Sequence, residues 1–445
     1  MERFSELLDD LAAMGPRGLA RFEASIDPEW IEQGLAFTGK ASLRRRKLPA
    51  DMVVWLVLGM ALFRDRSIVN VVEHLNLVAP GVASLAPSAI PAARRRLGAE
   101  PMEWLFRRVT KEYASAPRLG RFHGLEVLGI DGSHLRVQDS DENFEFFGKP
   151  GGRGGSGDAG YPQARIAVLL DLRSRLLVDA KFAPYAVPEL VLARQMVSSI
   201  PDDSITVLDR GFNDTSMFAR ILTGGTSRHV MVRLRNNQKF AGLQLLPDGS
   251  ALVRMSLGRE ARKEFPDLPA HIEGRVVAYQ HDGGSPARLF TTLTDHELFP
   301  AQELVELYHE RWELEVGYDE LKTHMFERNE CLRSKSPKAV EQELWGLLLV
   351  YNLVRREMLL VADDLGLPPT RVSFRTAILT VRDFWLISAW GAPGRVPRFL
   401  KDLRMTLGTL IIPPRRSERR YPRHVKIKMS NYKRNRGTRP REGPK

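Results

Sequence analysis

The sequence predicts an α/β protein with helical regions at both ends of the chain. Between Leu125 and Leu208 the expected order of elements is strand, strand, strand, helix, strand. Before residue 120 apolar residues recur at helical spacing, and from His229 to about Asp295 the chain is rich in strand-forming runs. The 445 residues are enough for two or three domains.

Residues 1–120 are expected to be helical. Phe4, Leu7, Leu8 and Leu11 have helical spacing, and a second apolar stretch extends from Met52 to Phe63. Two basic clusters, 44–47 and 94–96, interrupt this region, and Pro91 suits the first turn of a helix that contains the second cluster. That helix could recognise DNA or could present a solvated basic face, and the pattern leaves both readings open.

The next region predicts a sheet with acids at its strand ends. The expected strands are 125–130, 164–170, 176–182 and 204–208, with a helix over 188–200. Asp131 follows the first of these strands and Asp209 follows the last. The glycine-rich segment 139–161 lacks the Gly-Lys-Ser/Thr of a P-loop, and we expect a mobile loop there.

Further strands are expected at 230–234, 251–257, 274–279 and 288–293. A long helix from about Ala301 to His324 follows, and then helices from Ala339 to about Asp364. Pro413 and Pro414 introduce the C-terminal tail.

The positive charge is concentrated in that tail. Residues 415–445 contain thirteen Lys or Arg and two Glu, a net +11 out of the +12 of the whole chain. Such a polycation usually contacts phosphate backbones without sequence specificity. The alternative is a disordered, solvated tail.

Composition excludes several classes of protein. The single cysteine, Cys331, rules out an intramolecular disulfide and a multi-cysteine zinc site. The longest apolar run, 52–63, is too short to cross a bilayer, and acids near Met1 do not suit a signal peptide. We therefore expect a cytoplasmic protein with no membrane partner.

Four polar residues are predicted to share one face of the long helix. Tyr308, Arg311, Glu315 and Lys322 fall within an arc of about 60° at about 100° per residue. The alternative is a solvated face with an Arg311–Glu315 pair worth a few tenths of a kcal/mol. Four apolar neighbours favour a packed helix whose polar stripe faces a site: Trp312, Leu314, Val316 and Leu321.

The other acids of this helix are expected elsewhere. Glu313 and Glu320 point away from the stripe, and Asp319 is the one acid that could rival Glu315. Together with Asp131 and Asp209, Glu315 would supply three carboxylates. Carboxylates without His or Cys partners suit Mg²⁺ or Mn²⁺. One such ion can activate an attacking water or 3′-hydroxyl, and the other can stabilise the leaving 3′-oxygen of an in-line phosphoryl displacement.

The sequence resembles the DDE-type insertion-sequence transposases with a ribonuclease H-like catalytic core. The matching motifs are Ile130-Asp131-Gly132-Ser133, Leu208-Asp209-Arg210-Gly211-Phe212 and Tyr308-x2-Arg311-x3-Glu315-x6-Lys322. The last is the Tyr-Arg-Glu-Lys (YREK) signature of one large subgroup, which also inserts a β-rich segment between the second and third acids. The resemblance covers about residues 20–360.

This resemblance implies specific roles. Asp131, Asp209 and Glu315 would hold two Mg²⁺ ions, or Mn²⁺ in their place, and Tyr308, Arg311, Lys322 and Arg210 would contact DNA. The enzyme would cut at terminal inverted repeats and join the 3′ ends to target DNA. A homodimer would hold two ends in a synaptic complex, and the protein would associate with the nucleoid.

The implied domains are a helical DNA-end-binding domain at 1–120 and a catalytic domain at 121–360 with a β-rich insertion at about 226–297. A helical region at 361–412 and a basic tail at 413–445 complete the chain.

One feature departs from the family pattern. Members often form a hairpin at the transposon end and stack a flipped base on a tryptophan of the insertion, but no Trp occurs between Asp209 and Trp312. Phe290 or Tyr279 could substitute, although a strand aromatic is more often part of a core.

Two other functions fit parts of the pattern. A catalytically silent, transposase-derived DNA-binding regulator would not need the three acids, and a ribonuclease H-like nuclease without strand transfer would not need the helix stripe. His134 and His324 lie near the motifs, where a structural or exposed role is favoured over substrate contact. Cys331 is expected to be a buried small hydrophobe.

Overall fold

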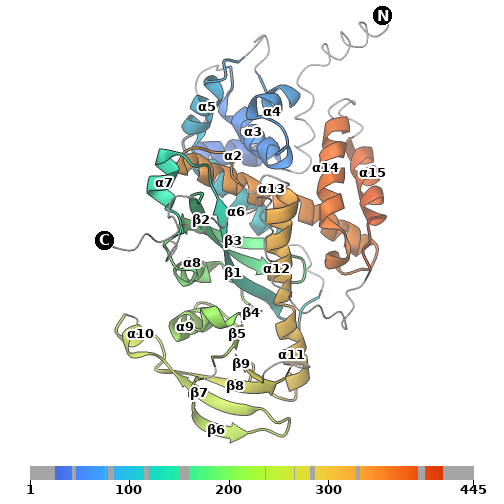
Figure 1. The fold of residues 1–445 in the computed structure, drawn as a ribbon. Coiled ribbons are helices and arrows are strands. Elements are labelled where there is room, and N and C mark those ends of the chain that lie inside the picture. The colour runs from blue at the N-terminus through green and yellow to red at the C-terminus, as the bar shows by residue number, and fades with distance from the viewer. Residues whose placement is uncertain are drawn as a thin grey trace, which may run out of the picture. The chain divides into compact units, whose positions relative to one another are not determined.

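The computed structural model describes residues 26–42, 47–75, 77–78, 85–114, 120–150, 160–235, 237–264, 266–280, 286–326, 331–388 and 396–413. The described residues from 26 to 412 belong to one compact unit (Figure 1). Three predicted features lie outside the described residues: the helical pattern of residues 4–11, the basic cluster at 44–46 and the tail from 414 onward.

A nine-stranded mixed sheet runs through this unit in the order β3-β2-β1-β4-β5-β9-β8-β7-β6. Its first five strands are β1 (Glu126–Arg136), β2 (Gln163–Asp171), β3 (Leu177–Pro184), β4 (Ser204–Leu208) and β5 (Arg228–Arg233). β1, β2 and β3 pair antiparallel, and β4 and β5 continue the sheet in parallel with β1. The predicted ribonuclease H-like mixed-sheet fold is confirmed.

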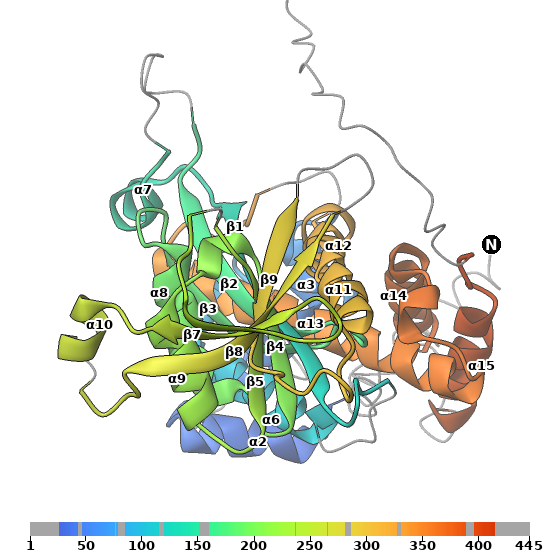
Figure 2. The ribbon, with the colours of Figure 1, turned by 90° about the horizontal axis from the view of Figure 1, so that it is seen from below.

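Alternating side chains divide the sheet between two hydrophobic cores. Val127, Val207 and Met231 belong to the first core, together with apolar residues of the N-terminal, central and C-terminal helices. Their neighbours Leu128, Leu208 and Val232 belong to the second core, on the opposite face. The second core includes residues of α8 (Glu189–Gln195), η2 (Val197–Ser199) and α9 (Thr215–Thr223). Figure 2 shows α8 and α9 on one side of the sheet and α11 and α12 on the other.

The β-rich insertion extends the central sheet. Its strands are β6 (Ala241–Leu245), β7 (Ala251–Ser256), β8 (His271–Tyr279) and β9 (Ala287–Thr291), with α10 (Arg259–Glu264) between β7 and β8. β9 pairs with β5, so the insertion and the strands β1 to β5 belong to one continuous sheet. Of these strands, β6 was not predicted, although Ala241, Leu243 and Leu245 alternate with less apolar residues; all five residues of the strand are exposed.

Helices of the N-terminal region pack against a long helix near the other end of the chain. They are α2 (Pro28–Phe37), α3 (Ala50–Leu62), α4 (Ile68–His74), α5 (Ala89–Leu97) and α6 (Glu100–Ala114). α13 (Pro337–Asp364) contacts α3 and α6 and also reaches β3. Arg64 after α3 forms a buried ion pair with Glu343 of α13 at 3.0 Å. α13 therefore helps to join the N-terminal helices to the sheet.

Three short helical elements follow α13. They are η5 (Pro369–Arg371), α14 (Phe374–Ser388) and α15 (Val396–Gly408). α14 and α15 pack on each other and on α13 (Figure 1). None of the described helices is long and apolar enough to span a membrane.

The structure corrects three local predictions. The expected helix 301–324 is broken into α11 (Ala301–His309), α12 (Trp312–Asp319) and a π-helical turn, η4 (Glu320–Met325). The expected loop 139–161 contains a short helix, α7 (Asp141–Phe147), capped by the Ser140 side chain; residues 151–159 lie outside the described part. β1 continues five residues past Asp131, because His134, Leu135 and their neighbours pair with β2.

Candidate active site

Strand register places Asp131 and Asp209 at adjacent positions of the sheet. Ile130 of β1 pairs with Leu208 of β4, and each acid is the next residue of its chain. Asp209 follows the end of β4 as predicted, whereas Asp131 lies within β1 and not at its tip. Strand alternation points both carboxylates toward the face that α11 and α12 cover.

The environment of Asp131 disfavours its charged form. Burial is the main cause that raises the pKa of this carboxyl to about 6, and the negative charge of Asp209 contributes to the rise, while a hydrogen bond from the Gly132 N–H at 2.8 Å lowers the pKa. Asp209 is half-buried and accepts hydrogen bonds from the backbone N–H groups of Gly211 and Phe212. Two neighbouring carboxylates of this kind attract a cation.

Glu315 comes to the site on α12, which packs beside β1 (Figure 1). Gly129 permits this approach, since a Cβ there would lie 2.7 Å from the Leu314 side chain. The Arg311 guanidinium donates to Glu315 Oε1 at 3.2 Å, and its charge also lowers the pKa of Asp131. Arg311 therefore lies within electrostatic reach of both acids.

Tyr308 is the last but one residue of α11, directly before the break in the helix. Its ring is buried, and burial raises the pKa of its hydroxyl to about 12. The Tyr308 ring lies 6.3 Å from that of Tyr279 on β8, which also approaches His309 at 6.2 Å. Tyr279 is half-buried at this edge of the site. Phe290, the other proposed stacking residue, is buried against Phe240 and cannot serve as a surface for a base.

The π-helical turn η4 brings Lys322 to the site. Its ammonium donates a hydrogen bond to the Ser133 hydroxyl, two residues after Asp131 on the same face of β1. Burial lowers the pKa of Lys322, and the charges of Asp131 and Glu189 oppose that shift. The angular prediction assumed one regular α-helix; the stripe instead combines two α-helices and a π-turn, yet its side chains still approach the same acids.

The apolar residues beside the polar stripe were predicted to be packed, and this is only partly so. Leu314 and Leu321 are buried, but Trp312 is 44% exposed and does not pack beside the site. Glu313 and Glu320 point elsewhere as expected and pair with Arg175. The Asp319 side chain is 60% exposed, accepts a hydrogen bond from Thr323 and pairs with His324 at 3.8 Å.

Two residues of the site were missed from the sequence. The Tyr318 hydroxyl donates to the carbonyl of Asp131 at 2.8 Å and fixes α12 to β1. Glu189, the first residue of α8, lies close enough to Asp131 to raise its pKa and pairs with Arg165 at 2.8 Å. Tyr318 lies three residues after Glu315, and this spacing could have indicated that the two side chains are neighbours on one helix face. No local pattern in the sequence indicates Glu189.

Arg210 and the basic cluster at 94–96 differ in exposure. Arg210 is exposed on η3 (Arg210–Phe212), directly after Asp209. Pro91 lies in the first turn of α5 as predicted, but Arg94 is buried and bonds Gln342, Ser334 and the carbonyl of Ala339. For Arg94 both readings, DNA recognition and a solvated face, are wrong, because the side chain joins α5 to the segment around α13.

Cys331, the single cysteine, and His134, three residues after Asp131, both pack against other parts of the protein. Cys331 is half-buried and not fully buried as predicted; burial raises the pKa of its thiol to about 11. The His134 ring packs on Tyr185 at 4.9 Å. Burial lowers the pKa of His134, and the charges of Arg165 and Lys322 lower it further.

The donor set suits a hard divalent cation, although the three acids are not gathered around one point. No group of three His, Cys, Asp or Glu side chains in the described part of the chain is arranged to hold a metal ion. Asp131 and Asp209 are neighbours, whereas Glu315 is bound to Arg311. Carboxylate oxygens alone match the preference of Mg²⁺ and Mn²⁺.

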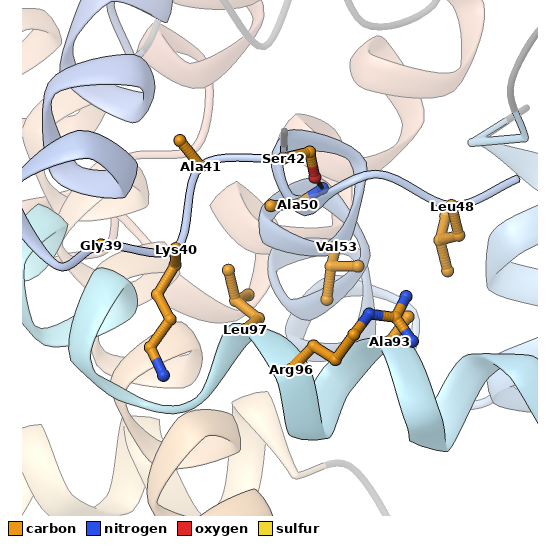
Figure 3. Close-up of a pocket in the computed structure, with 10 residues that line it drawn as sticks. All are labelled: Gly39, Lys40, Ala41, Ser42, Leu48, Ala50, Val53, Ala93, Arg96 and Leu97. Atoms are coloured by element: carbon orange, nitrogen blue, oxygen red, sulfur yellow. Dashed lines mark hydrogen bonds between the residues drawn. The ribbon is translucent and has the colours of Figure 1, made fainter. Parts of the chain in front are cut away.

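A separate cavity of about 270 Å³ lies in the N-terminal helical region. Its lining includes Lys40, Ser42 and Arg96, and the two cationic side chains extend in different directions (Figure 3). Neither the three acids nor the residues of the helix stripe line this cavity.

Comparisons with known proteins identify the family of the chain. Residues 123–353 match the family described as transposase DDE domain, and residues 16–107 match the insertion element 4 transposase N-terminal family. The transposase InsG for insertion sequence element IS4 of Escherichia coli (strain K12) is 34% identical over 434 residues, 97% of this chain and 96% of that protein. The putative transposase InsZ of the same organism is 37% identical over 52% of this chain and 78% of its own length.

Among solved structures, a piggyBac transposase synaptic complex with hairpin DNA is similar at a TM-score of 0.45 and 12% identity, covering 88% of this chain and 85% of that one. The family matches define a transposase with a DDE catalytic domain. The chain belongs to the IS4 family of DDE transposases.

Proposed function

We propose that this transposase cuts DNA at the terminal inverted repeats of its insertion sequence and joins the 3′ ends to target DNA. The observation that supports this most is the placement of Asp131 and Asp209 at adjacent sheet positions beside α12, which contains Glu315. These three carboxylates would hold two Mg²⁺ ions, with Mn²⁺ able to substitute. When bound, the ions supply Lewis-acid activation of a hydroxyl and stabilisation of a leaving 3′-oxygen.

The chain's own residues would orient the DNA. Arg311 and Lys322 would pair with phosphates near the scissile bond, and exposed Arg210 would contact the backbone beside Asp209. The buried Tyr308 hydroxyl keeps its proton at neutral pH and would donate a hydrogen bond to a phosphate oxygen. Phosphate binding would also draw Arg311 away from Glu315 and release that carboxylate for a metal ion.

The same proposal assigns a role to each region of the chain. Residues 1–120 would bind the element ends, 121–360 would catalyse the reaction with the insertion at about 226–297, and the helical region 361–412 would support them. The basic tail, 413–445, would bind phosphates nonspecifically. Two ends must be held together for joining, so we propose a homodimer on two DNA ends.

The test is cleavage of a linear DNA that includes the element's own terminal repeat, with Mg²⁺. We expect the unmodified protein to nick at the repeat boundary, and Glu315→Ala to bind the DNA without cutting it. Asp319→Ala is the matched control, because Asp319 is an exposed acid one turn further along α12 and should be dispensable. If all three proteins bind and none cuts, in Mn²⁺ as well, the protein is a catalytically silent DNA-binding regulator.

A second measurement separates strand transfer from simple hydrolysis. DNA ends with free 3′-hydroxyls are incubated with protein, Mg²⁺ and a supercoiled plasmid. Joined products support the transposase assignment of the site, whereas cleavage without any joining would favour a nuclease.

A further inference from the structure

The row of the sheet that contains the two acids continues onto β5. Ile130, Leu208 and Val232 are paired across β1, β4 and β5. The next residue of each chain is Asp131, Asp209 and Arg233. Arg233 therefore occupies the third position of the row that begins with the two acids.

Its side chain points to the same face as the acids. Met231 belongs to the core beneath α11 and α12, and Val232 belongs to the core on the opposite face. Because side chains alternate along a strand, Arg233 faces the side of Met231. Its cross-strand partner on β9, Leu289, lies in that same core.

The surroundings of Arg233 leave its guanidinium accessible. The residue is exposed, and within the described ranges it forms no ion pair with an Asp or Glu. Its positive charge lowers the pKa of Tyr279 and of Tyr308, which places it near the rings at the edge of the site. Arg311 acts on the same two tyrosines, so the charges of both arginines reach this aromatic pair.

We propose that Arg233 binds a backbone phosphate of the DNA next to the scissile bond, on the side of the β-rich insertion. This inference rests on the proposed function, because the DNA must pass over Asp131 and Asp209. A guanidinium presents paired N–H donors that match two phosphate oxygens. Strand register holds Arg233 beside the acids, so it fixes the distance between that phosphate and the reacting one.

The test measures DNA affinity across a salt series. The probe is a fluorescent duplex that includes the terminal repeat and its flanking DNA, read by anisotropy in Ca²⁺ to prevent cutting. We expect Arg233→Gln to weaken binding about threefold to tenfold near physiological salt and to reduce the slope of log K against log salt by about one. Arg233→Lys keeps the charge and should retain the slope.

Arg254→Gln is the matched control. Arg254 is an exposed arginine of β7 in the same sheet, paired with Glu273 at 3.1 Å and separated from β5 by β8 and β9. Its loss should leave affinity and slope unchanged. An unchanged slope in Arg233→Gln, or an equal loss in Arg254→Gln, would overturn the assignment.

Cleavage distinguishes failure of this inference from failure of the proposed function. If the unmodified protein binds and cuts the repeat while Arg233→Gln does both equally well, only the role of Arg233 is wrong. If the unmodified protein neither binds nor cuts the repeat, the proposed function itself fails. Circular dichroism of each variant checks that the exposed substitutions leave the fold intact.

Discussion

Asp131 combines burial with a neighbouring negative charge, and this combination makes its protonation dependent on pH near neutrality. Its pKa rises from 3.8 to about 6 in the folded protein. The folded state therefore binds more protons than the unfolded state between these values, and stability falls as pH rises from about 4 to about 6.

Replacing this acid should stabilise the metal-free protein. Asp131→Asn keeps an oxygen that can accept from the Gly132 N–H but removes the buried charge. Without divalent metal we expect the variant to be more stable than the unmodified protein at pH 7.5, by about 1–3 kcal/mol, and equal to it at pH 4. Thermal unfolding in EDTA at both pH values measures this. Equal stability at pH 7.5 would contradict the raised pKa.

Arg311 occupies the position of a counter-ion to Glu315 in the absence of metal. The two side chains approach to 3.2 Å, and the Arg311 charge also acts on Asp131. Arg311→Gln should therefore raise the affinity for Mn²⁺ without DNA about threefold to tenfold, because one competing positive charge is removed. Electron paramagnetic resonance of free Mn²⁺ gives the affinity.

Arg173→Gln is the control for that measurement. Arg173 pairs with Glu310 at 2.8 Å, so its loss should leave Mn²⁺ binding unchanged. Weaker Mn²⁺ binding by Arg311→Gln would show that the guanidinium supports the metal site and does not compete with it.

At the scale of elements, the approach of α12 to β1 decides whether Glu315 reaches the other two acids. Gly129→Ala would place a Cβ 2.7 Å from Leu314 and 2.8 Å from Leu172. We expect a loss of about 1–3 kcal/mol in stability from this overpacking, and a loss of cleavage as α12 moves outward. Gly258→Ala, which meets no atom within 4 Å, should change neither. Retained cleavage in Gly129→Ala would mean that the packing adapts without moving Glu315.

The start of the π-turn is anchored by a buried charge network. Glu320 pairs with Arg175 at 2.7 Å and with the fully buried Arg355 of α13, and it accepts a hydrogen bond from Tyr351 at 3.0 Å. This network fixes η4 and thereby the path of Lys322 to Ser133.

Removing the Glu320 carboxylate should lower the stability of the folded protein, because Arg355 would remain charged and buried. We expect Glu320→Gln to destabilise the protein by about 3–5 kcal/mol. Glu273→Gln removes the exposed partner of Arg254 by the same chemical change and should cost no more than about 1 kcal/mol. Thermal unfolding of the two variants compares them; similar losses would argue against the importance of the buried network.

For the whole molecule, charge is distributed very unequally along the chain. Residues 415–445 contribute +11 of the net +12. Deleting them should weaken binding to a duplex without the terminal repeat and flatten its salt dependence, since fewer counter-ions are released. Binding to a repeat-containing duplex should be less affected, and the ratio of the two affinities should rise. A constant ratio would show that the tail contributes equally to both.

Local patterns in the sequence were sufficient for most of the fold. Strand alternation and helical spacing depend on neighbouring residues, so β2 to β5 and α13 were predicted with small errors at their ends, and the proline at position 91 marked the first turn of α5. The motifs around Asp131, Asp209 and Glu315 were also local, and they predicted that the first two acids lie close together on neighbouring strands, although Asp131 lies within β1 and not at its end. Their catalytic role remains a prediction.

Tertiary structure decided the features that depend on distant partners. Arg94 is buried because Gln342, almost 250 residues away, satisfies its guanidinium, and no local pattern reveals that bond. The insertion joins the central sheet because β9 pairs with β5, and the π-turn η4 begins at Glu320, which pairs with Arg355 of α13. By itself the sequence determined which elements form and which acids end beside the sheet. Only long-range packing decided how Arg311, Lys322 and Arg233 are arranged around those acids, because burial and charge pairing act between residues that are close in space and distant in the chain.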